Sequence, residues 1–145
     1  PYVREDEMFD VNFLAVALAA LTFFVGGLWY APFAFGAVWA REAGVLAPGE
    51  APRPGARPGK HPGGVFAFAI LFSFLGAWTV AYLAGPHPTV ATGLRIGAAA
   101  GLGVAGTSFG INYQFAARSW RLFAIDVGFL AVMFTLFGLV LGLVG

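Results

Sequence analysis

Residues 26–39 read GGLWYAPFAFGAVW, and this stretch decides the fold. It ends an apolar run that starts at Val11, and the run has the roughly 20 residues that a helix needs to cross a hydrocarbon core. Trp29 and Tyr30 lie at its far end, where amphipathic rings prefer the headgroup level of a bilayer. Pro32 removes a backbone donor and disfavours a helical conformation at the residue before it. The stretch therefore predicts the end of a membrane helix and a bend.

Working outward from this stretch, we expect a first membrane helix over residues 11–31. A short amphipathic helix over residues 33–43 should follow it and lie along the membrane surface. Trp39 on that helix joins Trp29 and Tyr30 as the predicted interfacial aromatic residues.

The composition indicates the same class of protein. Of the 145 residues, 59% are hydrophobic and 10% are charged, whereas a soluble domain carries about 25% charged residues. The formal net charge is +1 and no basic stripe is present, so we expect no nucleic-acid partner. The chain has no cysteine, which excludes disulfides and cysteine-ligated metals within it. We therefore expect an integral membrane protein whose surroundings are the lipid bilayer.

Three further apolar stretches complete the predicted architecture. They span residues 64–84, 90–114 and 122–144, and Ser119 is a plausible N-cap for the last of them. The predicted fold class is all-α: a polytopic membrane protein with four transmembrane helices in two hairpins and a short interfacial helix after the first. We divide the chain into residues 1–10, 11–43, 44–63 and 64–145.

Two of these segments are polar. Residues 1–10 carry four acidic residues and one arginine. Met8, near the first span, is our candidate for the native start, with residues 1–7 contributed by upstream sequence. Residues 44–63 alternate prolines and glycines with basic residues and have no apolar period. They predict a solvent-exposed linker with polyproline character; a polyproline docking motif is the alternative, without a clear recognition pattern.

The distribution of basic residues predicts the topology. Four spans place both termini on one side of the membrane, with only Arg4 and Arg95 there. The other side carries six basic residues: Arg41, Arg53, Arg57, Lys60, Arg118 and Arg121. Since the positive side stays cytoplasmic, we expect a multi-pass protein of the bacterial inner membrane with both termini in the periplasm.

Small residues predict how the helices pack. On an ideal α-helix, three glycines of the third helix fall on one face and three on a second, so we expect this helix to lie between two neighbours. These sets are Gly93, Gly97 and Gly101, and Gly103, Gly106 and Gly110. A glycine-lined pore is the rival reading. On the fourth helix, Gly128, Thr135, Gly138 and Gly142 share one face, and we expect the opposite face, with Phe129, Met133 and Phe137, to meet lipid or a partner.

Ionisable residues within the predicted spans are the candidates for function. Arg95 is expected to snorkel to the outer face, or else to bind an anion or lipid headgroup. Asp126 is expected either to tie helices together through a hydrogen bond or to form a proton or ligand site. Its candidate partners at the same level are Tyr30, Asn112, Tyr113, Arg118 and Arg121.

The sequence offers no pattern for catalysis. There is no nucleophile–base pair, phosphate loop or metal cluster, and His87 between two prolines reads as a solvated turn residue across the membrane from His61. We therefore predict a non-enzyme that needs no cofactor or metal.

Two stretches resemble one family. Gly27-Leu28-Trp29-Tyr30-Ala31-Pro32, followed by Phe35-Gly36 and Trp39, is similar to the first-helix signature of the bacterial domain of unknown function 1761 family. Arg118-Ser119-Trp120-Arg121-Leu122 with Ile125-Asp126-Val127-Gly128 resembles the entry to its last helix. The resemblance implies a small four-helix membrane protein without an assigned activity. The chain differs in its longer, proline-rich linker, and in Phe129 and Leu130, where the family tends to have Tyr and His.

Taken together, these features favour a non-catalytic membrane protein that acts by helix–helix association. It would be an accessory or scaffolding subunit packed against other membrane subunits, or a homo-oligomer. The alternative is a small carrier or channel with Asp126 and Arg95 lining the path.

Overall fold

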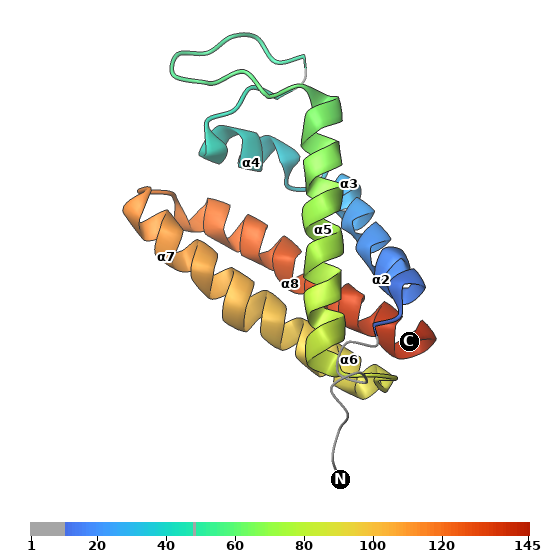
Figure 1. Ribbon diagram of the computed structural model, residues 1–145. Coiled ribbons are helices and arrows are strands. Elements are labelled where there is room, and N and C mark those ends of the chain that lie inside the picture. The colour runs from blue at the N-terminus through green and yellow to red at the C-terminus, as the bar shows by residue number, and fades with distance from the viewer. Residues whose placement is uncertain (1–10, 48) are drawn as a thin grey trace.

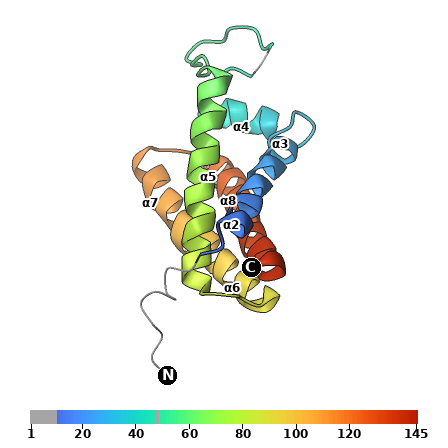
Figure 2. The ribbon, with the colours of Figure 1, turned by 45° about the vertical axis from the view of Figure 1, so that its right-hand side comes forward.

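The computed structural model describes residues 11–47 and 49–145, so the predicted polar segment 1–10, with Met8, lies outside the described residues. Over the described ranges the chain is all-helical apart from one isolated bridge between Val45 and Arg57. Figures 1 and 2 show a short helix, α4, lying crosswise to the long helix α5. The elements in chain order are α2 (Phe13–Ala20), the 3-10 helix η1 (Leu21–Val25), α3 (Gly26–Trp29), α4 (Gly36–Ala43), α5 (Pro62–Ala84), α6 (Val90–Ala98), the π-helix η2 (Ala99–Gly106), α7 (Thr107–Phe115) and α8 (Trp120–Val144).

The first helical segment, α2–η1–α3, is shorter at both ends than predicted. Asn12 is its N-cap, because the Asn12 side chain accepts a hydrogen bond of 3.1 Å from the backbone N–H three residues on. The segment ends at Trp29, and the chain then bends through Pro32. A β-carbon on Gly36 would collide with the Tyr30 carbonyl oxygen, so only glycine allows the close turn into α4.

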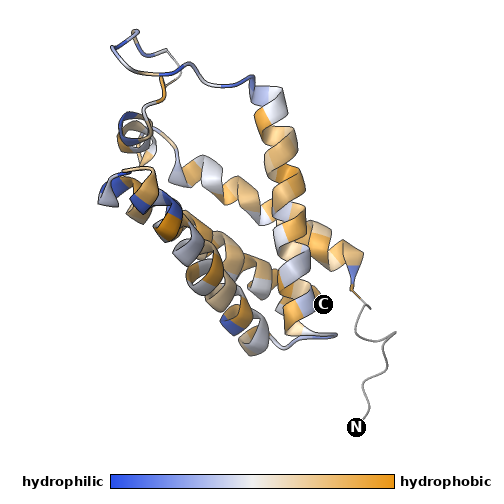
Figure 3. Ribbon diagram, turned by 60° about the vertical axis from the view of Figure 1, so that its left-hand side comes forward, coloured by the Kyte–Doolittle hydropathy of each residue, from blue (hydrophilic) through white to orange (hydrophobic). Residues whose placement is uncertain are grey.

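Three helices are long and apolar enough, by length and composition, to cross a membrane. They are α5, the continuous helix formed by α6, η2 and α7, and α8, and each begins within two residues of its predicted start. Figure 3 shows the apolar colour along these helices and the hydrophilic colour in the segment before α5. Ser119 is confirmed as the N-cap of α8, since its side chain accepts a hydrogen bond of 3.1 Å from the Leu122 N–H. The first segment has 17 residues and falls short of the same length criterion.

Helix α8 is the centre of the molecule. It packs against α2, α5 and α6, and the largest fully buried side chains come from three of these elements: Phe137 on α8, Val16 on α2 and Val80 on α5. Between α2 and α5 the buried Ser73 hydroxyl donates a hydrogen bond of 2.9 Å to the Ala20 carbonyl, at the point where α2 passes into η1. The core is therefore formed where these helices meet around α8.

The expectation that one face of α8 meets lipid or a partner is wrong. Its three members, Phe129, Met133 and Phe137, are all buried. A β-carbon on Gly26 of α3 would lie 2.9 Å from the Phe129 ring, and one on Gly76 of α5 would lie 3.3 Å from the Phe137 ring. Both faces of α8 are covered, because the first segment and α5 pack on the phenylalanine side while α6 packs on Gly138 and Gly142.

The third helix contacts two neighbours, as predicted, because α6 packs against both α8 and α5. The expectation that a separate glycine face meets each neighbour is wrong. The glycines that are closely packed all face α8. A β-carbon on Gly93 would collide with the Gly138 carbonyl oxygen, and one on Gly97 with the Phe134 carbonyl oxygen. Around Gly103, in contrast, no atom lies within 4 Å of the β-carbon position, so this glycine faces open space.

The π-helix η2 explains how Gly106, from the second glycine set, reaches the same partner as the first set. On an ideal α-helix, Gly106 would lie about 140° around the axis from Gly101. In a π-helix each N–H bonds to the carbonyl five residues back, so five residues make roughly one turn. Gly106 accordingly lies one turn below Gly101, whose carbonyl oxygen is 3.2 Å from the β-carbon position of Gly106, and both face α8.

The segment between α4 and α5, predicted as an exposed linker, is mostly exposed but is tied to α4. The Arg57 N–H donates to the Gly44 carbonyl at 2.9 Å, and the Leu46 N–H donates to the Arg57 carbonyl at 3.0 Å. The Arg53 guanidinium donates to the carbonyls of Ala40, at 3.1 Å, and Val45, at 3.0 Å. These carbonyls lie at and just after the C-terminal end of α4, where a positive charge interacts favourably with the helix dipole.

Candidate functional site

The candidate site is a buried carboxylate held by two tyrosines. Asp126, nearly two turns into α8, is 8% exposed. The Tyr30 hydroxyl, just after α3, donates to Asp126 Oδ1 at 2.7 Å, and the Tyr113 hydroxyl of α7 donates to Oδ2 at 2.6 Å. Each carboxylate oxygen thus has its own donor, and the two bonds tie the first and third segments of the chain to α8.

Trp29 adds a second polar tie next to this cluster. Its indole Nε1–H donates to the Ile125 backbone carbonyl at 3.0 Å. The indole ring lies against Gly128, where a β-carbon would be 2.9 Å from Trp29 Cζ2. A tryptophan can approach α8 this closely only because residue 128 has no side chain.

Two aromatic rings pack against Tyr30 of this cluster. Tyr30 makes edge-to-face contacts with Phe129, at a centroid distance of 5.2 Å, and with Trp39 of α4, at 5.7 Å. Such contacts stabilise the rings beyond the area that they bury. They also fix the direction of the Tyr30 hydroxyl toward Asp126.

The electrostatic environment of Asp126 contains hydroxyls but no paired cation. Among residues 11–47 and 49–145 the ion pair within 4 Å is the one between Arg53 and Glu50, far along the chain from this site. Arg118 and Arg121, two of the predicted partners, make no hydrogen bond to Asp126. A carboxylate with two hydroxyl donors can hold a structural hydrogen-bond network or take up a proton, and it offers no nucleophile.

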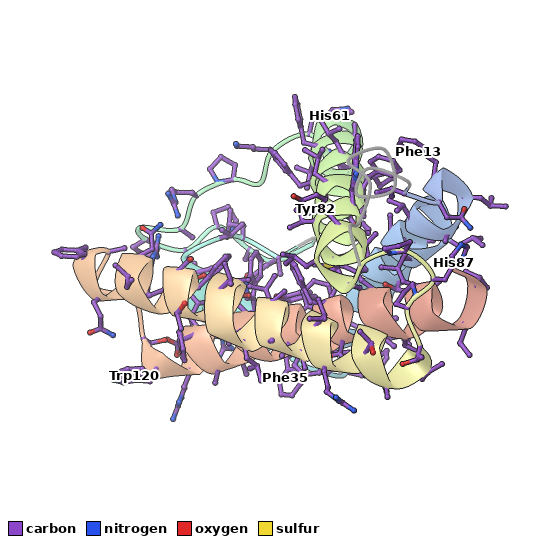
Figure 4. The ribbon with its side chains drawn as sticks, turned by 60° about the horizontal axis from the view of Figure 1, so that its bottom comes forward. Phe13, Phe35, His61, Tyr82, His87 and Trp120 are labelled. Atoms are coloured by element: carbon purple, nitrogen blue, oxygen red, sulfur yellow. The ribbon has the colours of Figure 1, made fainter. Side chains whose placement is uncertain are left out.

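The other predicted polar residues lie away from the cluster. Arg95 on α6 and Asn112 on α7 are both exposed, so the predicted contact between Asn112 and Asp126 is absent. His61 caps α5, accepting a hydrogen bond of 3.2 Å from the Gly63 N–H, while His87 lies in the turn after this helix, with Nδ1 3.0 Å from the Gly145 oxygen. Figure 4 labels both histidines. In the described part of the chain no group of three His, Cys, Asp or Glu side chains could hold a metal.

The other predicted packing glycines also lie between the third helix and α8. A β-carbon on Gly106 would be 2.9 Å from Val127 Cγ1, and one on Gly110 would be 3.3 Å from the Phe123 ring. On α8, Gly138 faces the Gly93 carbonyl in return, and a β-carbon on Gly142 would be 2.6 Å from Val90 Cα. The interface between the third helix and α8 thus runs from residue 93 to the level of Asp126.

Comparison with known families identifies the chain. The model of the family described as "Protein of unknown function (DUF1761)" matches residues 14–142. The chain belongs to this family. No curated protein and no solved structure matched the chain.

In this DUF1761 protein the two stretches that carried the resemblance touch each other. Trp29 and Tyr30 come from the first stretch, and Ile125 and Asp126, to which they donate, come from the second. Phe129, where the resemblance leads us to expect a tyrosine, packs on Tyr30 and so adds a ring rather than a hydroxyl to the cluster. The candidate site is therefore formed where these two stretches contact each other.

Sequence reasoning missed the Trp29 bond to Ile125, because a backbone carbonyl inside a helix carries no signal in the sequence. The glycine two residues after Asp126 could have suggested a large side chain lying on α8, but not which one.

Proposed function

We propose that this DUF1761 protein is a non-catalytic, four-span protein of the bacterial inner membrane that acts by helix–helix association. It serves as an accessory or scaffolding subunit of a larger membrane complex, or as a homo-oligomer. The observation that carries the proposal is the exposed surface formed by residues 62–68 of α5 and by the part of the third helix around Gly103.

The first part of this exposed surface is the N-terminal end of α5. Residues 62–68 are all exposed, and a run of two turns includes every side of a helix. On the third helix, Gly103 faces open space, and Thr107, Ser108 and Asn112 are exposed beside it. Figure 1 shows α5 and α7 diverging from the end where α5 and α6 lie together.

Lipid chains cannot form hydrogen bonds with the polar side chains of this surface. Thr107 and Ser108 satisfy their hydroxyls by donating to the Val104 carbonyl, at 3.1 and 2.7 Å, but an exposed amide such as that of Asn112 gains from a hydrogen-bonding partner in a bilayer. Small residues next to such groups allow another helix to approach closely. Together they support association with a further helix.

The first segment supports a fourth span despite its length. At 1.5 Å per α-helical residue and 2.0 Å per 3-10 residue, α2, η1 and α3 together extend about 28 Å. The hydrocarbon core is about 30 Å thick. With four spans, the basic residues between α4 and α5 and before α8 lie on one side, which places both termini in the periplasm.

The carrier alternative has less support. It requires Asp126 and Arg95 to line one path, whereas Asp126 is buried between tyrosines and Arg95 is exposed on α6. A cavity of about 60 Å³ lies beside Gly145, between Asn12, His87 and Leu141, and neither charged residue lines it.

Cysteine cross-linking tests the association. The chain has no cysteine of its own. A Phe68→Cys variant, with its cysteine on the exposed part of α5, can therefore be treated with a bifunctional maleimide in native membranes. We expect adducts of defined mass, either twice that of the chain or that of the chain plus one partner. Leu14→Cys on α2, equally exposed, is the matched control and should stay monomeric. A monomeric Phe68→Cys sample that co-purifies with no stoichiometric partner in mild detergent contradicts the proposal.

Single cysteines also test the topology. A cysteine in place of Gly59, in the segment before α5, should react with an impermeant maleimide only after the inner side is opened. A cysteine at Gly145, after α8, should react from outside in intact cells. Labelling of both from outside would contradict the four-span topology, because α5, the third helix and α8 separate the two positions.

A further inference from the structure

Three arginines from two separate segments converge on the C-terminal end of α4. Arg53 binds the Ala40 and Val45 carbonyls. Arg57 Nη2, from the segment before α5, and Arg118 Nη1, from the turn before α8, both lie 3.4 Å from the same oxygen, the Ala43 carbonyl. The two donor nitrogens are therefore no more than 6.8 Å apart, which is twice 3.4 Å.

Only one of these three arginines has a carboxylate partner in the described ranges. Arg53 Nε lies 3.1 Å from Glu50 Oε1. A hydrogen bond from the Ala47 N–H to Glu50 lowers the pKa of this carboxyl, so Glu50 stays charged and is committed to Arg53. Arg57 and Arg118 thus share one neutral carbonyl, and their positive charges repel each other at close range.

Capping of α4 accounts for only part of this arrangement. A guanidinium carries five N–H donors, and each of these two arginines uses one of them on the Ala43 carbonyl. The remaining donors suit a group with several oxygens and a negative charge, such as a phosphate, which arginine binds with paired hydrogen bonds. A phosphate between the two side chains would also remove their repulsion.

The position of α4 selects the source of the phosphate. Phe33 and Phe35, directly before α4, and Val38 on it are exposed apolar side chains, as in helices that lie in the plane of a membrane interface. Figure 1 shows α4 crosswise to α5, near the end of α5 that begins at Pro62. With the membrane placement proposed above, the arginine pair lies at the level of the lipid phosphates.

We propose that Arg57 and Arg118 form a binding site for the phosphate of an anionic phospholipid at the C-terminal end of α4. The site is distinct from the general positive charge of this side, because Arg57 and Arg118 converge on one oxygen, whereas Arg41, Lys60 and Arg121 do not converge on a common atom. It uses the membrane placement but not the association role.

The test compares thermal unfolding of the full chain in two kinds of vesicle, phosphatidylcholine alone and phosphatidylcholine mixed with phosphatidylglycerol. A ligand that binds only the folded state raises the melting temperature, so we expect phosphatidylglycerol to raise that of the parent by several degrees. The double variant Arg57→Gln/Arg118→Gln should lose more than half of this increment. Glutamine keeps an N–H for the Ala43 carbonyl, so the end of α4 stays capped.

The matched control is Lys60→Gln/Arg121→Gln, which removes the same net charge from exposed positions and should keep the increment. Native mass spectrometry of Arg57→Gln, with and without added phosphatidylglycerol, gives a second readout that does not depend on melting, and fewer retained lipids than in the parent are expected. Equal losses in the two double variants, no increment in the parent, or an equal increment from inorganic phosphate in phosphatidylcholine vesicles would each overturn the proposal. Failure of the cross-linking experiment on α5 would leave these readings unchanged.

Discussion

Replacing Gly138 with leucine should unfold the interface between α6 and α8. A β-carbon on Gly138 would collide with the Gly93 carbonyl oxygen, and one on Gly93 would collide with the Gly138 carbonyl oxygen. Neither obstacle is the end of a flexible side chain, so the two helices must separate along their length and lose close contacts. We expect a loss of about 3 kcal/mol or more in the free energy of unfolding, measured by chemical unfolding in mild detergent, with aggregation on size exclusion.

The matched control for this variant is Gly103→Leu on the third helix. No atom lies within 4 Å of the β-carbon position there, and leucine favours a helix more than glycine does. Stability should therefore be unchanged or slightly higher. Gly97→Leu and Gly101→Leu should behave like Gly138→Leu, because both positions face the backbone of α8. Equal tolerance of leucine at residues 103 and 138 would show that the glycines are not needed for close packing.

Asp126→Leu should have the second largest effect on stability. The change removes both acceptors and leaves the hydroxyls of Tyr30 and Tyr113 without their partner. Hydrogen bonds between membrane helices contribute modestly, and an unmade bond at a buried group costs more than its net gain. We expect a loss of about 1 to 2 kcal/mol, measured by the same unfolding assay. A leucine variant as stable as the parent would remove the helix-tying role of Asp126.

The isosteric variant Asp126→Asn separates the structural role from a proton-binding role. Asparagine keeps an acceptor for one tyrosine and cannot titrate, so we expect expression, stability and partner binding close to those of the parent. Tyr30→Phe and Tyr113→Phe, singly and together with Asp126→Asn, give a double-mutant cycle for each bond. An asparagine variant that folds normally but abolishes a measurable proton or ion flux would favour the carrier alternative instead.

Much of the fold could be predicted from apolar length, because a helix in lipid must satisfy its own backbone over about 20 residues. The first segment is the exception, since Asn12 caps it late and the bend at Pro32 ends it early. Which face of α8 is buried could not be predicted. A helix that is apolar on every side has no periodicity to read, and the burial of Phe137 depends on where α2 and α5 come to lie.

The candidate site was predictable in its residues and not in its geometry. A carboxylate inside a span needs a partner, so Asp126 could be predicted as a candidate functional residue. Tyr30 and Tyr113 were among the five residues predicted as its partners. The sequence could not choose between hydroxyls and arginines, because that choice depends on side-chain direction. The glycines of the third helix could also be identified from the sequence. An ideal angle of 100° per residue, however, assigns them to two faces and does not predict that they share one partner. The π-helix η2 changes that angle, and its sequence, AAGLGVAG, contains no signal that predicts a π-helix.

The central position of α8 has a consequence for biogenesis. It follows every other described helix in the sequence, so the ribosome makes it after the elements that pack around it. Until α8 emerges, the close-packed glycines of the third helix face no partner and the Tyr30 hydroxyl has no Asp126 to bind. The contact between α2 and α5 can form earlier, but the contacts centred on α8 can form only after α8 has been made. A nascent chain that stalls before Asp126 would expose its helix-packing surfaces to quality-control proteases.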